Sequence, residues 1–255
     1  MRAVRIEAWQ TMCNYKKPGS FQLGETYPLP PYSTVIGLVH ALCGYTAYEK
    51  MQVSIAGRYH SIVNDMFTEY TFGPGTKYEK PSGNSNPRFN TKLITENGDE
   101  LGISRGTSRK ELLVDVHLIL HICPENQEKL EEILQAFLCP REYPSLGRRE
   151  DLLRIDSVRV VELKTINVGE DTDDSITLLS NAYIPVKDIE KMEAKIEGTV
   201  YRLHKVFETG AKNGLRQWGE SVFARYASIN SVIDDGVVTV SQNDSNGELE
   251  TVFLA

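Results

Sequence analysis

A long strand followed at once by an amphipathic helix is the feature that most restricts the fold of this chain. Residues 112–122 (LLVDVHLILHI) alternate, so that five aliphatic side chains share one face of a β-strand. Pro124 follows the strand. Residues 125–138 then repeat apolar side chains at helical spacing, with acidic residues at the N-terminal end, where the helix dipole favours them. A fold that mixes helices with a sheet is therefore predicted.

The same order of elements occurs earlier in the chain. Residues 3–9 alternate as a half-buried strand, and Ser33 or Thr34 is the expected N-cap of a helix with the sequence VIGLVHALCGYTAYEKM. Strands are also predicted over residues 53–63 and residues 157–166. The full order of strand, helix, strand, strand, helix, strand is that of the ferredoxin-like βαββαβ fold.

A long insertion interrupts this order between the second and third strands, over residues 64–110. It carries turn signals such as Gly73-Pro74-Gly75, and Asn97-Gly98 predicts the tip of a hairpin between TKLIT and ELGIS. The chain after residue 166 predicts β-strands apart from a short helical stretch near DIEKMEAK. The expected domains are residues 1–166, with the insertion, and residues 167–255.

Composition indicates a globular protein with its negative charge concentrated near the C-terminus. The formal net charge is −7, with −5 over residues 161–199, +3 over residues 200–226 and −5 over residues 227–255.

The four cysteines form no C-x-x-C pair, which argues against a zinc module or a disulfide scaffold and fits a reducing compartment. No apolar run of membrane-spanning length and no secretory start are present, so we expect a cytoplasmic protein.

The common catalytic motifs are missing from the sequence. There is no P-loop, no G-x-G-x-x-G, no H-E-x-x-H and no G-x-S-x-G, so no cofactor or metal is predicted. His117 and His121 share one strand face about 13 Å apart, too far for two ligands of one zinc ion. A polar sheet face is the favoured interpretation. The other is an imidazole that cleaves RNA by general acid–base chemistry without a metal.

Three features could contact nucleic acid. The helix start at Ser33 and Thr34 could bind a phosphate, as any helix N-terminus could. Tyr32 could stack on a base or pack in the core. The turn at residues 147–149 could clamp a backbone, because glycine allows close approach and arginine makes bidentate phosphate contacts. The candidate RNA-binding residues are Tyr32, Ser33, Thr34, Arg88, Lys92, Arg105, Arg109, Lys110, Gly147, Arg148 and Arg149.

Other charged and aromatic side chains have simpler interpretations. Any single basic cluster is most simply solvated loop charge. Trp9 and Trp218 are expected in the core or at a partner surface rather than as stacking platforms.

Two segments together resemble one protein family. PPYSTVIGLVHALCG resembles the first helix of the CRISPR-associated Cas-five family, and YPSLGRREDLLRI resembles that family's L-G-R-x-E-x-[LF] segment. The strand TSRKELLVDVHLIL is similar to the family's third strand. The resemblance covers the N-terminal two-thirds of the chain and is nearest to the type I-B version of the family.

The resemblance implies a RAMP-superfamily subunit of the type I Cascade complex. Its fold class would be α+β: a ferredoxin-like (RRM-like) βαββαβ domain with an inserted thumb hairpin, plus a small C-terminal β-rich domain. Such a subunit grips the 5′ handle of crRNA, contacts the Cascade backbone subunit and large subunit, and meets target DNA indirectly. The insertion at residues 64–110 would be the thumb, and the acidic C-terminal third would face protein.

Three functions remain open at this stage. The first is a non-catalytic RNA-binding assembly subunit. The second is a metal-independent endoribonuclease that processes CRISPR repeat RNA, because one subtype of the family cleaves repeats with Tyr, Lys and His. Tyr45, Tyr48, Lys110 and His117 supply those residue types here without matching the family's set. The third is a ferredoxin-like metabolic enzyme, which the missing cofactor motifs argue against.

Overall fold

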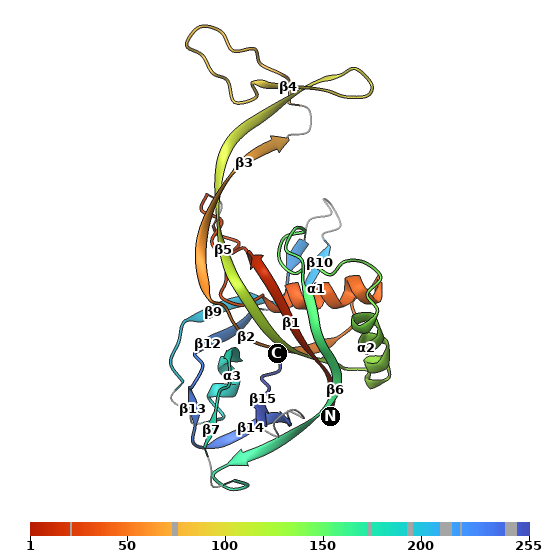
Figure 1. Ribbon diagram of the computed structural model, residues 1–255, viewed down its shortest axis with the longest axis vertical. Coiled ribbons are helices and arrows are strands. Elements are labelled where there is room, and N and C mark those ends of the chain that lie inside the picture. Colours follow the sequence, from red (N-terminus) through yellow and green to blue (C-terminus); the bar gives the residue numbers. More distant parts are fainter. Residues whose placement is uncertain are drawn as a thin grey trace. The chain divides into compact units, whose positions relative to one another are not determined.

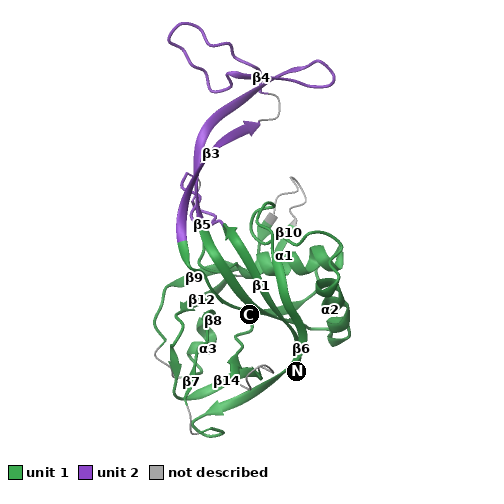
Figure 2. Cartoon of the chain, viewed as in Figure 1, with its two compact units in different colours: residues 1–15, 27–61, 113–255 green, residues 16–26, 62–112 purple. Residues whose placement is uncertain are grey.

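The computed structural model describes residues 1–20, 22–72, 76–172, 175–192, 196–209, 216–219, 221–242 and 249–255. The chain divides into two compact units (Figure 2). Unit 1 comprises residues 1–15, 27–61 and 113–255, and unit 2 comprises residues 16–26 and 62–112.

An antiparallel sheet forms the centre of unit 1 (Figure 1). β1 (Arg2–Cys13) lies between β5 (Glu100–Pro124) and β6 (Arg154–Val168), and β2 (Met51–Arg58) pairs with the other edge of β5. The order across unit 1 is β15-β14-β6-β1-β5-β2-β8-β12-β9. The outer strands are β8 (Asn181–Pro185), β9 (Val200–His204), β12 (Ser221–Ala227), β14 (Gly236–Gln242) and β15 (Leu249–Thr251).

Two helices pack on one face of the central strands. α1 (Tyr32–Cys43) contacts β2, and α2 (Leu130–Leu138), which follows the 3-10 turn η1 (Gln127–Lys129), contacts β1 and β6. Alternate apolar side chains of β1 and β5, such as Ile6 and Leu120, are fully buried in this layer. The period of two along each strand therefore places the main core between the sheet and the helices.

The opposite face of the central strands is polar and only partly covered. β14 and β15 lie against one end of it, where Ser54 accepts a 3.0 Å hydrogen bond from the backbone of Phe253. A second buried cluster joins residues of the C-terminal third, including Ile184, Val238 and Phe253. The C-terminal third thus adds strands and a core of its own to unit 1.

Most predicted elements are confirmed, with shifted ends. The first helix ends at Cys43 rather than near residue 51, because Gly44 adopts a left-handed φ of 74° that stops it. The expected strand over residues 53–63 is two strands, since β2 ends at Arg58 and β3 (Ser61–Phe72) begins a new one. The second helix begins in its α-form at Leu130, five residues later than expected, after the turn capped by the Asn126 side chain.

The C-terminal third contains short strands that the sequence pattern did not reveal. β7 (Ile176–Thr177) pairs with β13 (Val232–Ile233), and β10 (Phe207–Thr209) pairs with β11 (Arg216–Trp218). The helix expected near DIEKMEAK is the single turn α3 (Val186–Ile189), and residues 193–195 of that stretch lie outside the described residues. The division into domains 1–166 and 167–255 stays a prediction.

Unit 2 contains most of the predicted insertion. β3 and β4 (Thr91–Ile94) both pair with the first part of β5. The hairpin expected at Asn97-Gly98 is confirmed, because Gly98 has a φ of 82° and its N–H donates to the Thr95 carbonyl. Gly73-Pro74-Gly75 lies outside the described residues. Residues 16–26 also belong to this unit, which the sequence did not predict.

A buried ion pair ties β15 to the polar face of β1. Arg5, which is 1% exposed, donates from Nε and Nη2 to the two carboxylate oxygens of Glu250 at 2.7 and 3.0 Å. His121 Nε2 lies 3.3 Å from the same carboxylate and 3.2 Å from Ser241 Oγ. Burial alone would raise the pKa of Glu250, but hydrogen bonds and attraction from His121 and Arg5 outweigh it and lower that pKa from 4.5 to about 2.

We predict that Glu250→Gln lowers the free energy of unfolding by about 3 kcal/mol near neutral pH, because the buried Arg5 loses its buried carboxylate partner and keeps the half-exposed Glu7, whose Oε1 lies 2.5 Å from Nη1. Glu250 has a lowered pKa in the folded state, so its stabilisation is present above pH 4.5 and is lost as the pH falls toward 2. Urea unfolding at a series of pH values measures this. The difference between wild type and variant should shrink over that interval.

A control variant separates the histidine from the carboxylate. Burial lowers the pKa of His121, so the folded protein loses stability as the pH falls below 6.5, where the imidazole of the unfolded chain takes up a proton. His121→Gln should abolish this part of the pH dependence. A Glu250→Gln protein with the same stability and pH profile as wild type would contradict the structural role of this ion pair.

Candidate functional site

Two segments that are far apart in the sequence line one groove of about 580 Å³ in unit 1. One segment is α1, and the other is the connection between α2 and β6. These are the two segments that carry the family resemblance, so the fold brings both motifs together. The lining residues of this motif groove are Thr34, Gly37, Leu38, Ala41, Leu42, Glu142, Tyr143, Pro144, Ser145, Gly147, Arg149 and Leu152.

The N-terminus of α1 differs from the sequence expectation. Pro31 is the N-cap, and its carbonyl accepts a hydrogen bond from Thr34 N–H at 2.9 Å. Ser33 and Thr34 therefore lie within the first turn, and the prediction that one of them caps the helix is wrong. Both are partly exposed, and Thr34 faces the motif groove.

Tyr32 is fully buried and cannot stack on a base. Its ring lies 6.1 Å from that of Tyr183, whose hydroxyl donates to the Leu29 carbonyl at 2.9 Å. The stacking role proposed for Tyr32 is therefore wrong. The physical reason is that the first helical residue points its side chain back toward the sheet, where apolar surface is removed from water.

Gly37 lines the groove in the middle of an exposed helix face. A Cβ atom built at this position would meet nothing within 4 Å, so the packing of α1 does not require glycine. Glycine inside a helix costs about 0.5–1 kcal/mol relative to alanine. The absence of a side chain leaves the helix backbone open to close approach by a ligand.

A buried carboxylate holds the loop on the other side of the groove. Asp151 is 1% exposed and accepts hydrogen bonds from the backbone N–H groups of Asn14 and Arg148 at 3.0 and 2.9 Å. The Arg148 guanidinium binds the same carboxylate at 2.6–3.1 Å. The side-chain amide of Gln10 on β1 donates to the Asp151 carbonyl at 3.0 Å and to the Leu146 carbonyl at 2.9 Å. The loop is thus attached to the central strand.

Gly147 has a conformational role in this loop. Its φ is 107°, and a Cβ atom there would lie 2.8 Å from the Asn14 carbonyl oxygen and 2.9 Å from Asp151 Oδ2. Any other residue would be strained and would push against the bound carboxylate. The glycine therefore permits the turn, and close approach to a nucleic acid is not needed to explain it.

The two adjacent arginines have different environments. Arg148 is 21% exposed in its side chain and binds Asp151 and, at 3.1 Å, Glu150. Arg149 is exposed, faces the motif groove and makes no ion pair within the described part of the chain. Arg148 therefore anchors the loop, whereas Arg149 presents its guanidinium to the groove.

Comparison with known proteins decides the family. The family model described as CRISPR-associated protein (Cas_Cas5) matches residues 3–217 of the chain, which include both motif segments. The chain belongs to this family. The Cas_Cas5 assignment confirms the resemblance seen in the sequence and places the chain among CRISPR-associated defence proteins, while the type I-B subtype stays a prediction.

One solved structure shows the same fold at low sequence identity. A chain described as "CRISPR RNA-guided surveillance complex" is similar with a TM-score of 0.54 and 15% identity, over 90% of this chain and 91% of that chain. A second, "Crystal structure of a CRISPR protein from Archaeoglobus fulgidus", has a TM-score of 0.43 and 9% identity over 100% of both chains. No curated protein matches the chain. Within the described residues, no helix is both long and apolar enough to cross a membrane.

The other sequence-predicted basic residues of this Cas_Cas5 chain lie in unit 2. Arg105 and Arg109 are exposed on β5, and the Lys110 ammonium lies 4.4 Å from the centre of the Phe67 ring. Arg88 and Lys92 are exposed, the first beside Phe89 and the second paired with Glu100. The expectation that these residues and Arg148-Arg149 line one RNA groove stays a prediction.

The two tyrosines of the candidate Tyr, Lys and His set contact a histidine other than His117. Tyr45 and Tyr48 both contact the His40 ring, and Lys129 covers the Tyr45 ring at 4.5 Å. Both ring nitrogens of His40 are hydrogen-bonded, because Nδ1 donates to the Ile36 carbonyl at 2.8 Å and Nε2 accepts from the Glu49 N–H at 3.0 Å.

His117 and His121 share the polar sheet face, as expected, but differ in access to solvent. His121 is buried beneath β14 and β15, whereas the His117 side chain is 44% exposed and lies 3.3 Å from Asp115 Oδ1. His117 is thus the one of these two imidazoles that a ligand could reach.

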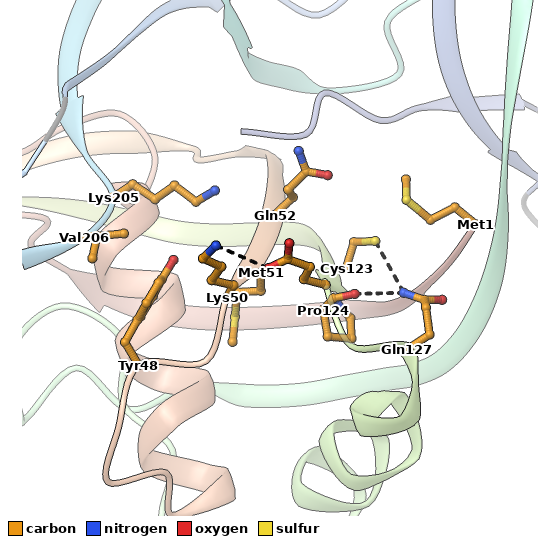
Figure 3. Close-up of a pocket in the computed structure, with 11 residues that line it drawn as sticks. Met1, Tyr48, Lys50, Met51, Gln52, Cys123, Pro124, Gln127, Lys205 and Val206 are labelled. Atoms are coloured by element: carbon orange, nitrogen blue, oxygen red, sulfur yellow. Dashed lines mark hydrogen bonds and ion pairs between the residues drawn. The ribbon is translucent and has the colours of Figure 1, made fainter.

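A separate hollow of about 590 Å³ lies near the start of β2 and the end of β5 (Figure 3). Tyr48, Gln52 and Lys205 line it, and Lys50 in the same hollow pairs with Glu125 at 3.7 Å. Burial, followed by repulsion from Lys187, lowers the pKa of Lys205. This hollow shares no lining residue with the motif groove.

Sequence reasoning missed two groove residues. Tyr143 is 88% exposed beside the groove, and its signal was an aromatic residue inside the polar loop CPREYPSLGRRED. Gly37 was visible as a glycine within a helical pattern, which calls for a packing or functional reason.

We predict that Arg148→Ala lowers the free energy of unfolding by about 2 kcal/mol, because it leaves the buried Asp151 carboxylate without its charged donor. Arg149→Ala should change it by less than about 0.5 kcal/mol, as is usual for an exposed side chain. Chemical denaturation of the two single variants measures both values. Equal stability of the two proteins would show that Arg148 is ordinary surface charge.

Proposed function

We propose that this protein is a non-catalytic RNA-binding subunit of a type I CRISPR surveillance complex, which grips the 5′ handle of crRNA and helps to assemble the complex. Membership of the Cas_Cas5 family supports the CRISPR role. The single observation that carries the RNA-binding role is the motif groove, where both family segments meet and Arg149 is exposed. A groove with an exposed guanidinium that forms no ion pair among the described residues, a bare helix backbone and an exposed Tyr143 suits a single-stranded backbone with bases.

We also propose that the central strands and helices form a ferredoxin-like core. The strand order β6-β1-β5-β2, with antiparallel pairing throughout and both helices on one face, supports this arrangement. On this interpretation unit 2 is the thumb that meets the Cascade backbone subunit. The acidic C-terminal third would then face the large subunit, and target DNA would be reached only through the assembled complex.

The binding experiment compares two exposed arginines of unit 1. Arg149→Ala should weaken binding of a 5′-handle RNA and reduce the log–log salt dependence by about 0.7, the value for one phosphate contact on a single strand. Arg202→Ala is the matched control, because Arg202 is exposed on β9 outside the groove. Fluorescence polarisation at several salt concentrations measures both. An unchanged salt slope for Arg149→Ala, or no RNA binding by the wild-type protein, would refute the proposed groove.

The thumb assignment has its own test. Deletion of residues 75–100 removes β4 and the Asn97-Gly98 hairpin and leaves every helix and strand wholly within unit 1 intact. We expect the circular dichroism spectrum to keep its main features and assembly with the backbone subunit to be lost. Normal assembly of the deleted protein on size-exclusion chromatography would remove the thumb assignment.

The alternative function is a metal-independent endoribonuclease, and one contact favours it. His117 is exposed and lies within hydrogen-bond reach of Asp115, the arrangement that orients an imidazole for acid–base chemistry. A nucleophile-activating partner from Tyr45 or Tyr48 is not placed beside it, because those tyrosines contact His40.

We expect purified protein to leave an intact CRISPR repeat RNA uncut in EDTA, because Tyr45 and Tyr48 contact His40, whose two ring nitrogens are both hydrogen-bonded, rather than the exposed His117. Denaturing gel electrophoresis of labelled repeat RNA measures this. Cleavage at one site that disappears in a His117→Ala variant would instead establish the nuclease.

A further inference from the structure

A row of four side chains crosses the open face of the central sheet, outside the motif groove. The strand register pairs Arg154 of β6 with Trp9 of β1, Trp9 with His117 of β5, and His117 with Arg58 of β2. Residues paired across strands point to the same face, so the four side chains lie next to one another. With strands about 4.8 Å apart, the row spans about 14 Å.

Three members of this sheet row are linked, either by direct contact of planar groups or through a shared carboxylate. The Arg154 guanidinium lies over the Trp9 ring, 4.4 Å from its centre, and is held in place by Asp156 at 2.6 and 3.2 Å. Trp9 Nε1 donates to Asp115 Oδ1 at 2.6 Å, and His117 Nε2 lies 3.3 Å from the same oxygen. One carboxylate therefore orients both the indole and the imidazole.

Asp115 adopts a strained backbone to do this. Its φ is 53°, a left-handed value in the middle of β5 for a residue that is not glycine. Such a conformation is unfavourable for a residue other than glycine and persists where surrounding contacts enforce it. The hydrogen bond from Trp9, together with attraction from His117, lowers the pKa of Asp115, so the carboxylate stays ionised and keeps both rings in place.

The buried core does not account for this arrangement. The neighbouring residues Ala8, Val116 and Leu118 face the helices and are buried, whereas the Asp115 and His117 side chains are 51% and 44% exposed. Among the described residues, β14 and β15 contact the same sheet face at His121 and Arg5. Arg58 at the end of the row is exposed and has no ion pair within the described residues.

We propose that the sheet row binds single-stranded RNA by stacking two neighbouring bases, one on the Trp9–Arg154 pair and one on His117, with Arg58 at a phosphate. This deepens and rests on the proposed function, since it names a second contact for the RNA that the motif groove holds. Aromatic and guanidinium planes on central strands bind bases in this way because every base has a π-face. The charged members are mostly paired, so stacking rather than charge supplies the affinity.

The test uses the fact that the chain has two tryptophans. Trp218→Phe leaves Trp9 as the only tryptophan, and Trp9→Phe leaves Trp218, which stacks on His204 of β9. Each protein is titrated with an eight-nucleotide oligouridylate and with the 5′-handle RNA, while binding is followed independently by polarisation of labelled RNA. We expect saturable quenching only in the Trp218→Phe protein, with the same Kd as polarisation gives.

Substitutions then measure how much the row contributes. Trp9→Ala should weaken RNA binding roughly ten- to a hundred-fold with little change in the salt slope, and Trp9→Phe should retain most of the affinity. Asp115→Gly removes the carboxylate while accepting the positive φ. It should weaken RNA binding without lowering the melting temperature, a result that a purely structural role would not give.

The outcomes separate this proposal from the proposed function. RNA binding by polarisation with no quenching of Trp9 would overturn the sheet row and leave the motif groove standing. Quenching of Trp9 by a purified Cascade subunit, and not by RNA, would also overturn it and make the row a protein contact. No RNA binding by any of these proteins would refute both.

Discussion

The register of β1 is the constraint on which the rest of the structure depends. β1 has neighbours on both sides, and its side chains alternate between the helical core and the polar face. A slip of one residue would move Ile6 into the polar face and Arg5 into the apolar core, so burial holds the register strongly. Three features then follow from this alternation, two on the polar face and one on the helical face. Arg5 reaches Glu250, Trp9 joins the sheet row, and Gln10 holds the loop at residues 145–152.

Two carboxylates organise the two surfaces that we assign to RNA. Asp151 is buried and bound by backbone N–H groups and by Arg148, so it shapes the loop and leaves Arg149 directed to the motif groove. Asp115 is exposed and strained, and it orients two rings on the open sheet face. The same residue type thus acts once through burial and once through local geometry.

Much of the fold could be predicted from the sequence, because strand and helix periods are local signals. The order of β1, α1, β2, β5, α2 and β6 was visible in the alternation and in the apolar stripes. The ends were less accurate where a single conformation decides them, as with the left-handed Gly44. The short strands β7 and β13 carry no periodic signal, since two residues cannot show a period. Their pairing depends on contacts between segments more than fifty residues apart.

The candidate site was predictable in its segments and not in its side chains. Sequence alone selected both motif segments, because their residue types and spacing are specific to a family. It could not show that Tyr32 is buried, that Pro31 is the N-cap, or that Arg148 binds Asp151 while Arg149 does not. Adjacent residues in a turn point in different directions, and only the folded loop determines which one meets solvent.

The sequence by itself therefore determined the longer elements, their order and the family, since these depend on local periodicity and on matched motifs. The tertiary structure decided which side chains are neighbours across strands and which carboxylate binds which arginine. Trp9, His117, Arg58 and Arg154 lie far apart in the chain and become one row only through the pairing of four strands. Strand pairing is a long-range choice, made by the total burial of the sheet, and no short segment of sequence encodes it.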